Sequence, residues 1–152
     1  MNPAQSLWRF SLDLYGQPGM EAACLDLQER FGADVNLVLY CLWRGRLSGP
    51  ELVAADTAVR RLRDDITVPL RRMRRALARQ GGEAALRESI KQAELEAERL
   101  EQALLQDLSP DRGPAGNGAA VAHLRLYAGL LGCPEDAFLD AATPLLAHLE
   151  TD

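Results

Sequence analysis

The chain has 152 residues, of which 47% are apolar and 26% are charged, and its formal net charge is −5. These values are typical of one soluble globular domain, and they exclude an intrinsically disordered chain. The acidic balance weakly opposes binding to nucleic acid or to an anionic membrane by the protein as a whole.

The N-terminal part of the chain predicts two short helices. Asn2 is expected to cap the first, with Pro3 in its first position, and apolar residues recur at helical spacing as far as Tyr15. A Gly-Gln-Pro-Gly turn separates this helix from a second, for which Gly32 is the expected stop. The expected inner face of the second helix consists of Met20, Cys24, Leu27 and Phe31.

The stretch 35–43 is apolar or aromatic at every position except Asn36. A helix without a polar face is surrounded by protein on all sides. Asp34 is placed to cap its start, and Gly45 is placed to end it. We therefore expect a central buried helix around which the other helices pack. Because this run is about half as long as the ~20 residues of a membrane span, we expect no membrane segment.

From residue 50 the apolar residues recur at steps of three and four along two long segments. This pattern predicts an antiparallel hairpin of helices 50–79 and 83–108, joined by a Gln-Gly-Gly turn. Pro69 lacks a backbone donor, so we expect a kink or a break near Thr67 and Val68. The expected inward residues are Leu52, Ala55, Val59, Leu62, Ile66, Pro69, Met73 and Ala76 on the first helix, and Leu86, Ile90, Ala93, Ala97, Leu100 and Leu104 on the second.

The charges of the two helices also favour the hairpin. Residues 60–79 hold eight Arg and two Asp, whereas residues 83–111 hold eight acidic residues, two Arg and one Lys. Arg63 and Glu101 flank the two stripes and are expected to meet across them, as a pair that sets register more than stability. In this register the facing pairs are Met73 with Ile90, Ile66 with Ala97, and Val59 with Leu104.

Residues 109–118 hold five Gly or Pro and predict a flexible surface loop. A helix over 119–131 should follow, and then a helix that starts at Pro134 and is divided near Thr143-Pro144. No segment alternates apolar and polar residues for long enough to be a strand. We predict one all-α domain over residues 1–152, a helical bundle with a central buried helix and a long antiparallel helical hairpin.

Several motifs of the N-terminal half have fixed spacings. They are Trp8-Arg-Phe-Ser-Leu, Tyr15, Pro18-Gly19, Ala23-Cys24-Leu25, Gly32-Ala-Asp-Val-Asn-Leu and Leu42-Trp43. This pattern resembles a bacterial family of small uncharacterised helical proteins known as a domain of unknown function. The resemblance implies no activity, and it marks residues 1–80 as the defining part of the chain.

Asn36, Trp8 and Trp43 are candidate interaction residues. A buried amide must find hydrogen-bond partners, so Asn36 is expected to cap a neighbouring helix end or loop, for instance near Pro18-Gly19. The alternative is that Asn36 reads a ligand in a pocket with the aromatic residues around it. Trp8 and Trp43 are expected in the core, and the alternative is that they anchor a partner at the surface.

The segment Arg71-Arg72-Met73-Arg74-Arg75 is the strongest electrostatic feature of the chain. We expect its Arg71, Arg72, Arg74 and Arg75 to be neutralised by the acidic helix beside them. The alternative is a nucleic-acid- or ribosome-associated protein that uses a basic patch over Arg71–Arg79. The acidic total and the lack of interleaved aromatic residues weigh against this alternative.

The sequence holds no nucleophile, phosphate-binding, dinucleotide-binding or zinc motif, so we predict no enzyme and no cofactor or metal. Its three cysteines lack Cys-x-x-Cys spacing, and no basic segment followed by an apolar one opens the chain, which predicts reduced thiols in the cytoplasm. We expect a protein partner that binds a helical surface, with Leu95 and Leu105 off the hairpin stripe and facing that partner. Pairing of the hairpin helices between two copies, in a homodimer, stays open.

Overall fold

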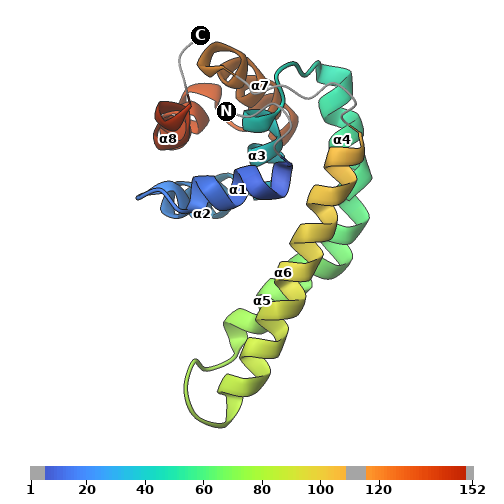
Figure 1. The fold of residues 1–152 in the computed structure, drawn as a ribbon, viewed down its shortest axis with the longest axis vertical. Helices are drawn as coiled ribbons and strands as arrows, with labels where there is room; N and C mark the ends of the chain where they lie inside the picture. Colours follow the sequence, from blue (N-terminus) through green and yellow to red (C-terminus); the bar gives the residue numbers. More distant parts are fainter. Residues whose placement is uncertain (1–5, 109–115, 150–152) are drawn as a thin grey trace.

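The computed structural model describes residues 6–108 and 116–149, and all regular secondary structure in these ranges is helical. The all-α prediction is therefore confirmed. Figure 1 shows a compact head from which a long arm of two antiparallel helical segments projects. The head consists of α1 (Leu7–Tyr15), α2 (Met20–Phe31), α3 (Val35–Trp43), α7 (Asn117–Leu131) and α8 (Glu135–His148), and the arm consists of α4 (Gly49–Leu62), η1 (Arg63–Thr67), α5 (Val68–Ala76), η2 (Gly81–Glu83) and α6 (Ala84–Asp107).

Helix α3 forms the centre of the head, as predicted. Every residue from Asn36 to Trp43 is buried, and α1, α2, α6 and α7 all pack on this helix. The Asp34 side chain caps its start by accepting a hydrogen bond from the backbone N–H of Asn36 at 2.9 Å. The helix ends at Trp43, with Arg44 as its C-cap, so Gly45 lies one residue beyond the observed cap.

The ends of α1 and α2 also follow the sequence. Gly16 terminates α1, and Gly32 terminates α2 in the left-handed conformation (φ 68°) that favours glycine. The predicted start at Asn2-Pro3 lies outside the described residues, and α1 begins after Ser6, whose hydroxyl accepts from a backbone N–H of the first turn. The inner face of α2 is as expected, with Met20, Cys24 and Leu27 buried and Phe31 partly buried.

The arm is the predicted antiparallel hairpin, because α6 runs back along α5, η1 and α4. The predicted interruption near Thr67 is a π-helical turn, η1, and α5 begins after it with Pro69 in its first turn. A π turn holds more residues than an α turn, so it moves the following positions around the helix axis.

The predicted register of the hairpin is wrong by about one helical turn. The Thr67 hydroxyl lies 2.6 Å from a carboxylate oxygen of Glu101, whereas the predicted register puts Ile66 opposite Ala97. The inward face is rotated as well, because the extra residue of η1 turns Thr67 inward and leaves Met73 exposed. On α6 the buried residues are Glu94, Ala97, Glu101, Gln102 and Leu105, and the apolar stripe predicted to be inward is largely exposed.

The C-terminal helices close the head on the side of α2 and α3. Most of the predicted loop 109–118 lies outside the described residues, and its last two positions already belong to α7. The predicted division of the last helix is wrong, because α8 continues through Pro144. Phe138 and Leu145, on either side of this proline, are fully buried, and α8 packs along α2 and α7, so both halves are held on one axis. Within the described residues, no helix has the length and apolar character that a membrane span requires.

Candidate functional site

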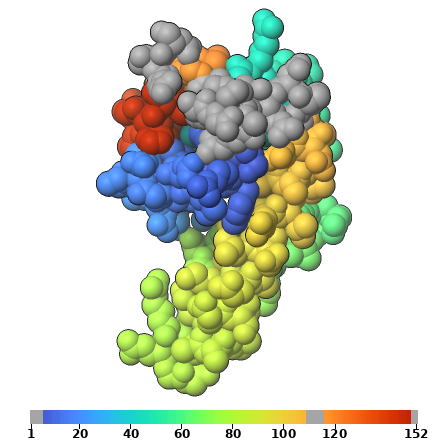
Figure 2. All heavy atoms as spheres, viewed as in Figure 1, coloured from blue at the N-terminus to red at the C-terminus, as the bar shows by residue number. Residues whose placement is uncertain are grey.

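A cleft of about 660 Å³ lies where α2 and the turn after it meet η1, α5 and α6. Figure 2 shows the surface indented where the head meets the arm. The volume is in the range of small-molecule sites. Half of the residues that line it are charged, and its apolar lining residues include Leu25, Val35 and Val68.

Asp34 lies in this cleft and is held from two directions. Its backbone N–H donates to the Tyr127 hydroxyl at 2.8 Å, and its Oδ1 accepts from the Asn36 backbone N–H at 2.9 Å. The other oxygen, Oδ2, is buried and has no hydrogen-bond partner. The Arg63 guanidinium lies 3.5 Å from it. The cap of α3 thus leaves one carboxylate oxygen buried beside Arg63.

Glu101 is the second buried carboxyl group of the cleft, and only 1% of its surface is exposed. The Thr67 hydroxyl donates to its Oε2 at 2.6 Å, whereas its Oε1 is buried without a hydrogen-bond partner. Burial, together with the charge of Asp34 and a hydrogen bond with it, raises the pKa of Glu101 to about 8. At neutral pH this carboxyl group therefore keeps its proton, with which it hydrogen-bonds to Asp34.

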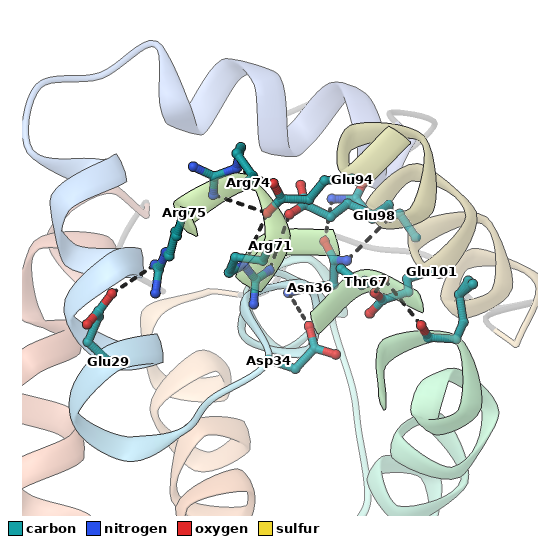
Figure 3. Close-up of polar contacts among 12 residues, drawn as sticks. Glu29, Asp34, Asn36, Thr67, Arg71, Arg74, Arg75, Glu94, Glu98 and Glu101 are labelled. Atoms are coloured by element: carbon teal, nitrogen blue, oxygen red, sulfur yellow. Dashed lines mark hydrogen bonds and ion pairs between the residues drawn. The ribbon is translucent and has the colours of Figure 1, made fainter. Parts of the chain in front are cut away.

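Asn36 joins the head to the arm (Figure 3). Its Nδ2 donates to the backbone carbonyl of Glu98 at 3.3 Å, and its Oδ1 accepts from the Gln102 amide at 3.0 Å. Gln102 in turn reaches the Ser11 hydroxyl of α1 at 3.3 Å. The amide finds its partners on α6 and not near Pro18-Gly19, and it lines the cleft, so the pocket alternative from the sequence stands.

The expectation that the acidic helix neutralises all four arginines of α5 is confirmed for Arg71 and Arg74, whereas Arg75 pairs with a glutamate of α2 instead. Arg72 is exposed. The ion pairs, drawn in Figure 3, are Arg71 with Glu94 (3.1 Å) and Glu98 (3.3 Å), Arg74 with Glu94, and Arg75 with Glu29 (2.8 Å). These carboxylates neutralise much of the basic patch.

The model of one protein family matches residues 6–105, and its description is "Protein of unknown function (DUF2390)". The chain belongs to this family. Comparison with curated proteins and with solved structures finds no match. The resemblance to an uncharacterised family is thus confirmed at the level of a domain of unknown function. The DUF2390 match contains the whole cleft segment from Asp34 to Glu101 and leaves α7 and α8 outside.

The two tryptophans of this DUF2390 chain differ in environment. Trp43 is buried in the head beside Tyr40, with 6.3 Å between ring centroids, so it is a core residue and cannot anchor a partner at the surface. Trp8 is partly exposed, and the Arg99 guanidinium lies 5.0 Å above its ring. The sequence preference for the core is therefore correct for Trp43.

The cleft has groups that bind charge but few that would attack a substrate. Cys24 lines it, and burial raises the pKa of this thiol to about 11, so the thiol is protonated at neutral pH. His123 lies in the head, where its Nδ1 is 2.8 Å from the Cys41 carbonyl. Among the described residues, no three His, Cys, Asp or Glu side chains are grouped as metal ligands.

Sequence reasoning did not find that Asp34, Thr67 and Glu101 form one site. It assigned Asp34 only to capping, and it paired Glu101 with Arg63. In the structure Arg63 bonds instead to Asp56 at 2.8 Å and to Asp64 at 3.1 Å. The one signal that pointed here was Asn36, whose buried amide required partners from another element.

A second feature lies outside the cleft, on α6. We call Leu86, Leu100, Leu104 and Leu108 the leucine row, and their exposed fractions are 54%, 58%, 41% and 42%. Their spacing places them on one face of the helix. Leu95 is exposed on the opposite face, whereas Leu105 is fully buried, so the expectation that both face a partner is wrong for Leu105.

The arm helix that pairs with α6 adds apolar surface beside the leucine row. Ile66 and Met73 are exposed by 40% and 46%. Ile66 in η1 and Met73 in α5 each directly precede a residue that bonds to a glutamate of α6, namely Thr67 and Arg74. The hairpin therefore presents an apolar seam that its own two helices leave uncovered.

Proposed function

We propose that this protein is a cytoplasmic, non-enzymatic interaction module that binds a helical protein partner along the leucine row of its arm. The observation that carries this proposal is the leucine row itself. Single exposed leucines are ordinary, but a line of four on one helix face, flanked by Ile66 and Met73, marks an interaction surface. A helix packs on such a line with side chains at steps of three and four.

A second copy of this chain has the chemistry to fill the seam. Two helical hairpins that bury their seams against one another make a four-helix bundle, which is the common closed form of this pattern. A twofold axis can place the Arg-rich α5 of one copy beside the acidic α6 of the other. Burying half-exposed leucines adds roughly 1 kcal/mol for each side chain.

Binding of nucleic acid through Arg71–Arg79 is the other role that the sequence suggests. The ion pairs of Arg71, Arg74 and Arg75 weigh against it, because binding to phosphate would have to break them. The non-enzymatic part of the proposal draws support from the cleft, where the arginines are paired and Cys24 is protonated.

The test compares two variants of α6 that carry the same kind of change on opposite faces. Sedimentation velocity over a concentration series would measure self-association, and a photo-crosslinking residue at Leu100 would capture a different helical partner in cells. Leu100→Glu with Leu104→Glu should abolish the assembly, and Leu95→Glu should leave it intact. A wild-type chain that stays monomeric and forms no specific crosslink would refute the proposal, and so would equal loss in both variants.

A further inference from the structure

The apolar core of the protein reaches only part of the way into the arm. It includes Leu52, Ala55 and Val59 of α4 and Leu105 of α6, which belong to one cluster with residues of α1, α3 and α7. We call this part the base of the arm. The other buried residues of the arm are polar except for one alanine; they are Thr67, Glu94, Ala97, Glu101 and Gln102. The arm is thus anchored to the head by apolar packing at its base and by polar contacts beyond it.

Several hydrogen bonds and ion pairs cross between the head and the arm beyond the base. Asn36 bonds to the Glu98 carbonyl at 3.3 Å and to the Gln102 amide at 3.0 Å. Arg75 of α5 pairs with Glu29 of α2 at 2.8 Å, and the cleft lies between α2 and the arm. Water can replace polar contacts of this kind at little net cost, so the arm can move away from α2 without breaking the apolar core.

One of these crossings joins two buried carboxyl groups, both drawn in Figure 3. Asp34 precedes α3 in the head, Glu101 belongs to α6 in the arm, and their side chains form a hydrogen bond. The Asp34 side chain is 8% exposed and Glu101 is 1% exposed. Two carboxylates have no donor between them, so this bond exists only while one group keeps its proton. Burial, followed by the charge of Asp34, raises the pKa of Glu101 to about 8, which identifies Glu101 as that group.

We propose that the Asp34–Glu101 pair is a proton-dependent latch between the head and the arm. While Glu101 is protonated, its bond to Asp34 holds the arm against the head. Loss of this proton releases the latch, and the arm swings about its apolar base so that the cleft opens. The latch acts within the folded chain and is independent of the interaction surface on α6.

The surroundings of the pair explain why loss of the proton would drive the two carboxylates apart. Arg63 is the cation at Asp34, 3.5 Å from its Oδ2, and this guanidinium is already paired with Asp56 at 2.8 Å and with Asp64 at 3.1 Å. A second negative charge at Glu101 would therefore lie buried beside Asp34 with little to offset it. Opening the cleft brings water to both groups and removes this repulsion.

The other charged and titratable groups around the cleft differ from Glu101 in charge or in position. They are Tyr15 in α1, Glu21 and Cys24 in α2, Asp64 in η1, Arg71, Arg74 and Arg75 in α5, Glu94 and Glu98 in α6, and Tyr127 of α7, which bonds to Asp34. Burial raises the pKa of Cys24 to about 11 and those of both tyrosines above their usual range, so all three stay neutral below about pH 9. Burial also raises the pKa of Glu98, but this carboxyl group pairs with Arg71 inside the arm.

The direction of the pH dependence follows from where the proton is held. The closed form binds it up to about pH 8, whereas the open form, in which water reaches Glu101, releases it near the ordinary value of 4.5. Low pH therefore favours the closed form. Because opening releases one proton, the ratio of open to closed molecules should rise about tenfold per pH unit up to about pH 8 and level off above it.

The test is single-molecule fluorescence energy transfer on the full chain between about pH 6 and about pH 9, a range that brackets the pKa of Glu101. The dyes are attached to p-acetylphenylalanine introduced at Gln17, in the exposed turn after α1, and at Gln80, at the exposed tip of the arm. This labelling leaves the three native cysteines unchanged. A population with low transfer should grow with pH, while circular dichroism shows that the helix content is retained.

Two variants on α6 identify the group that titrates. Glu101→Gln has no proton to lose and offers an N–H to Asp34, so its arm should stay closed over the whole pH range. Glu98→Gln, less than one turn away, removes the other carboxyl group of α6 with a raised pKa and should still open as the wild type does.

Four results would overturn the latch. They are wild-type transfer that does not change up to about pH 9, loss of helix content together with the fall in transfer, the same pH dependence in Glu101→Gln, and no pH dependence in Glu98→Gln. The first two use only the wild-type chain, so they decide the question even if a variant does not fold. Unchanged transfer would mean that water enters the cleft while the arm stays in place.

Discussion

Replacing Glu101 with Gln should make the protein more stable at alkaline pH and hardly change it at acidic pH. In the wild type the folded state raises the pKa of Glu101 from 4.5 to about 8, chiefly because the group is buried and faces Asp34. The folded chain therefore holds a proton that the unfolded chain releases. Stability from this group is fully present below about pH 4.5 and is lost as the pH rises through about 8.

The size of the effect follows from the shift. A pKa difference of one unit corresponds to 1.36 kcal/mol, so the wild type should lose about 4 kcal/mol through Glu101 between about pH 4.5 and about pH 8. Gln carries no charge, keeps an acceptor for Thr67 and offers an N–H to Asp34 in place of the acid proton. The variant should match the wild type at about pH 4.5 and exceed it by a few kcal/mol at about pH 9.

Urea unfolding followed by circular dichroism, at several pH values, measures both curves. Asp34, Arg63, Asp64, Arg71 and Glu98 are present in both proteins, so the difference between the curves isolates Glu101. The matched control is Glu96→Gln on the same helix, whose curve should run parallel to the wild type. Parallel curves for Glu101→Gln as well would show that Glu101 is not held protonated in the folded chain.

Three further changes test the packing, each by urea unfolding. Leu105→Ala should lower the free energy of unfolding by about 2–5 kcal/mol, because Leu105 is fully buried. Leu104→Ala, on the neighbouring exposed face, should lower it by less than about 1 kcal/mol. Similar losses in the two variants would contradict the observed rotation of α6. Asn36→Ala should cost about 1–3 kcal/mol, since it removes both side-chain bonds to α6, and an unchanged midpoint would show that these bonds add nothing. Deleting Asp65, which is exposed in the π turn, should preserve cooperative unfolding, because the turn holds one residue more than a regular α-helix needs. Deleting Glu96 from the regular helix α6 should abolish it. Equal loss of cooperative unfolding in the two deletions would refute our account of the π turn.

Local chemistry was sufficient to predict the central helix and the helix ends. Asp34 caps α3 and Gly32 ends α2 because a capping side chain and a left-handed glycine act within a few residues of the chain. The hairpin was also predictable, because the apolar stripe and the net charge of each helix can be read from the sequence of that helix alone. The partners of Asn36 were not, because they lie 62 and 66 residues away on α6.

The cleft escaped prediction because its parts look ordinary in sequence. Glu101 is one acid among many on a charged helix, and nothing local separates it from its exposed neighbour Glu96. Only the packing of α6 against the head buries one and exposes the other. A prediction that places the most apolar stripe of α6 on the inside is therefore wrong, because polar residues occupy much of the face that is buried in the structure.

The π turn explains how this exchange of faces arises in the arm. Along α4 the inward residues are the predicted ones, Leu52, Ala55 and Val59. Beyond the turn the inward line passes through Thr67 instead of Ile66, because the turn holds one more residue than the periodicity assumes. The same shift brings the Thr67 hydroxyl to Glu101 and turns Ile66 out toward the seam. One inserted residue thus produces both the polar cleft on one side of the arm and the uncovered apolar surface on the other.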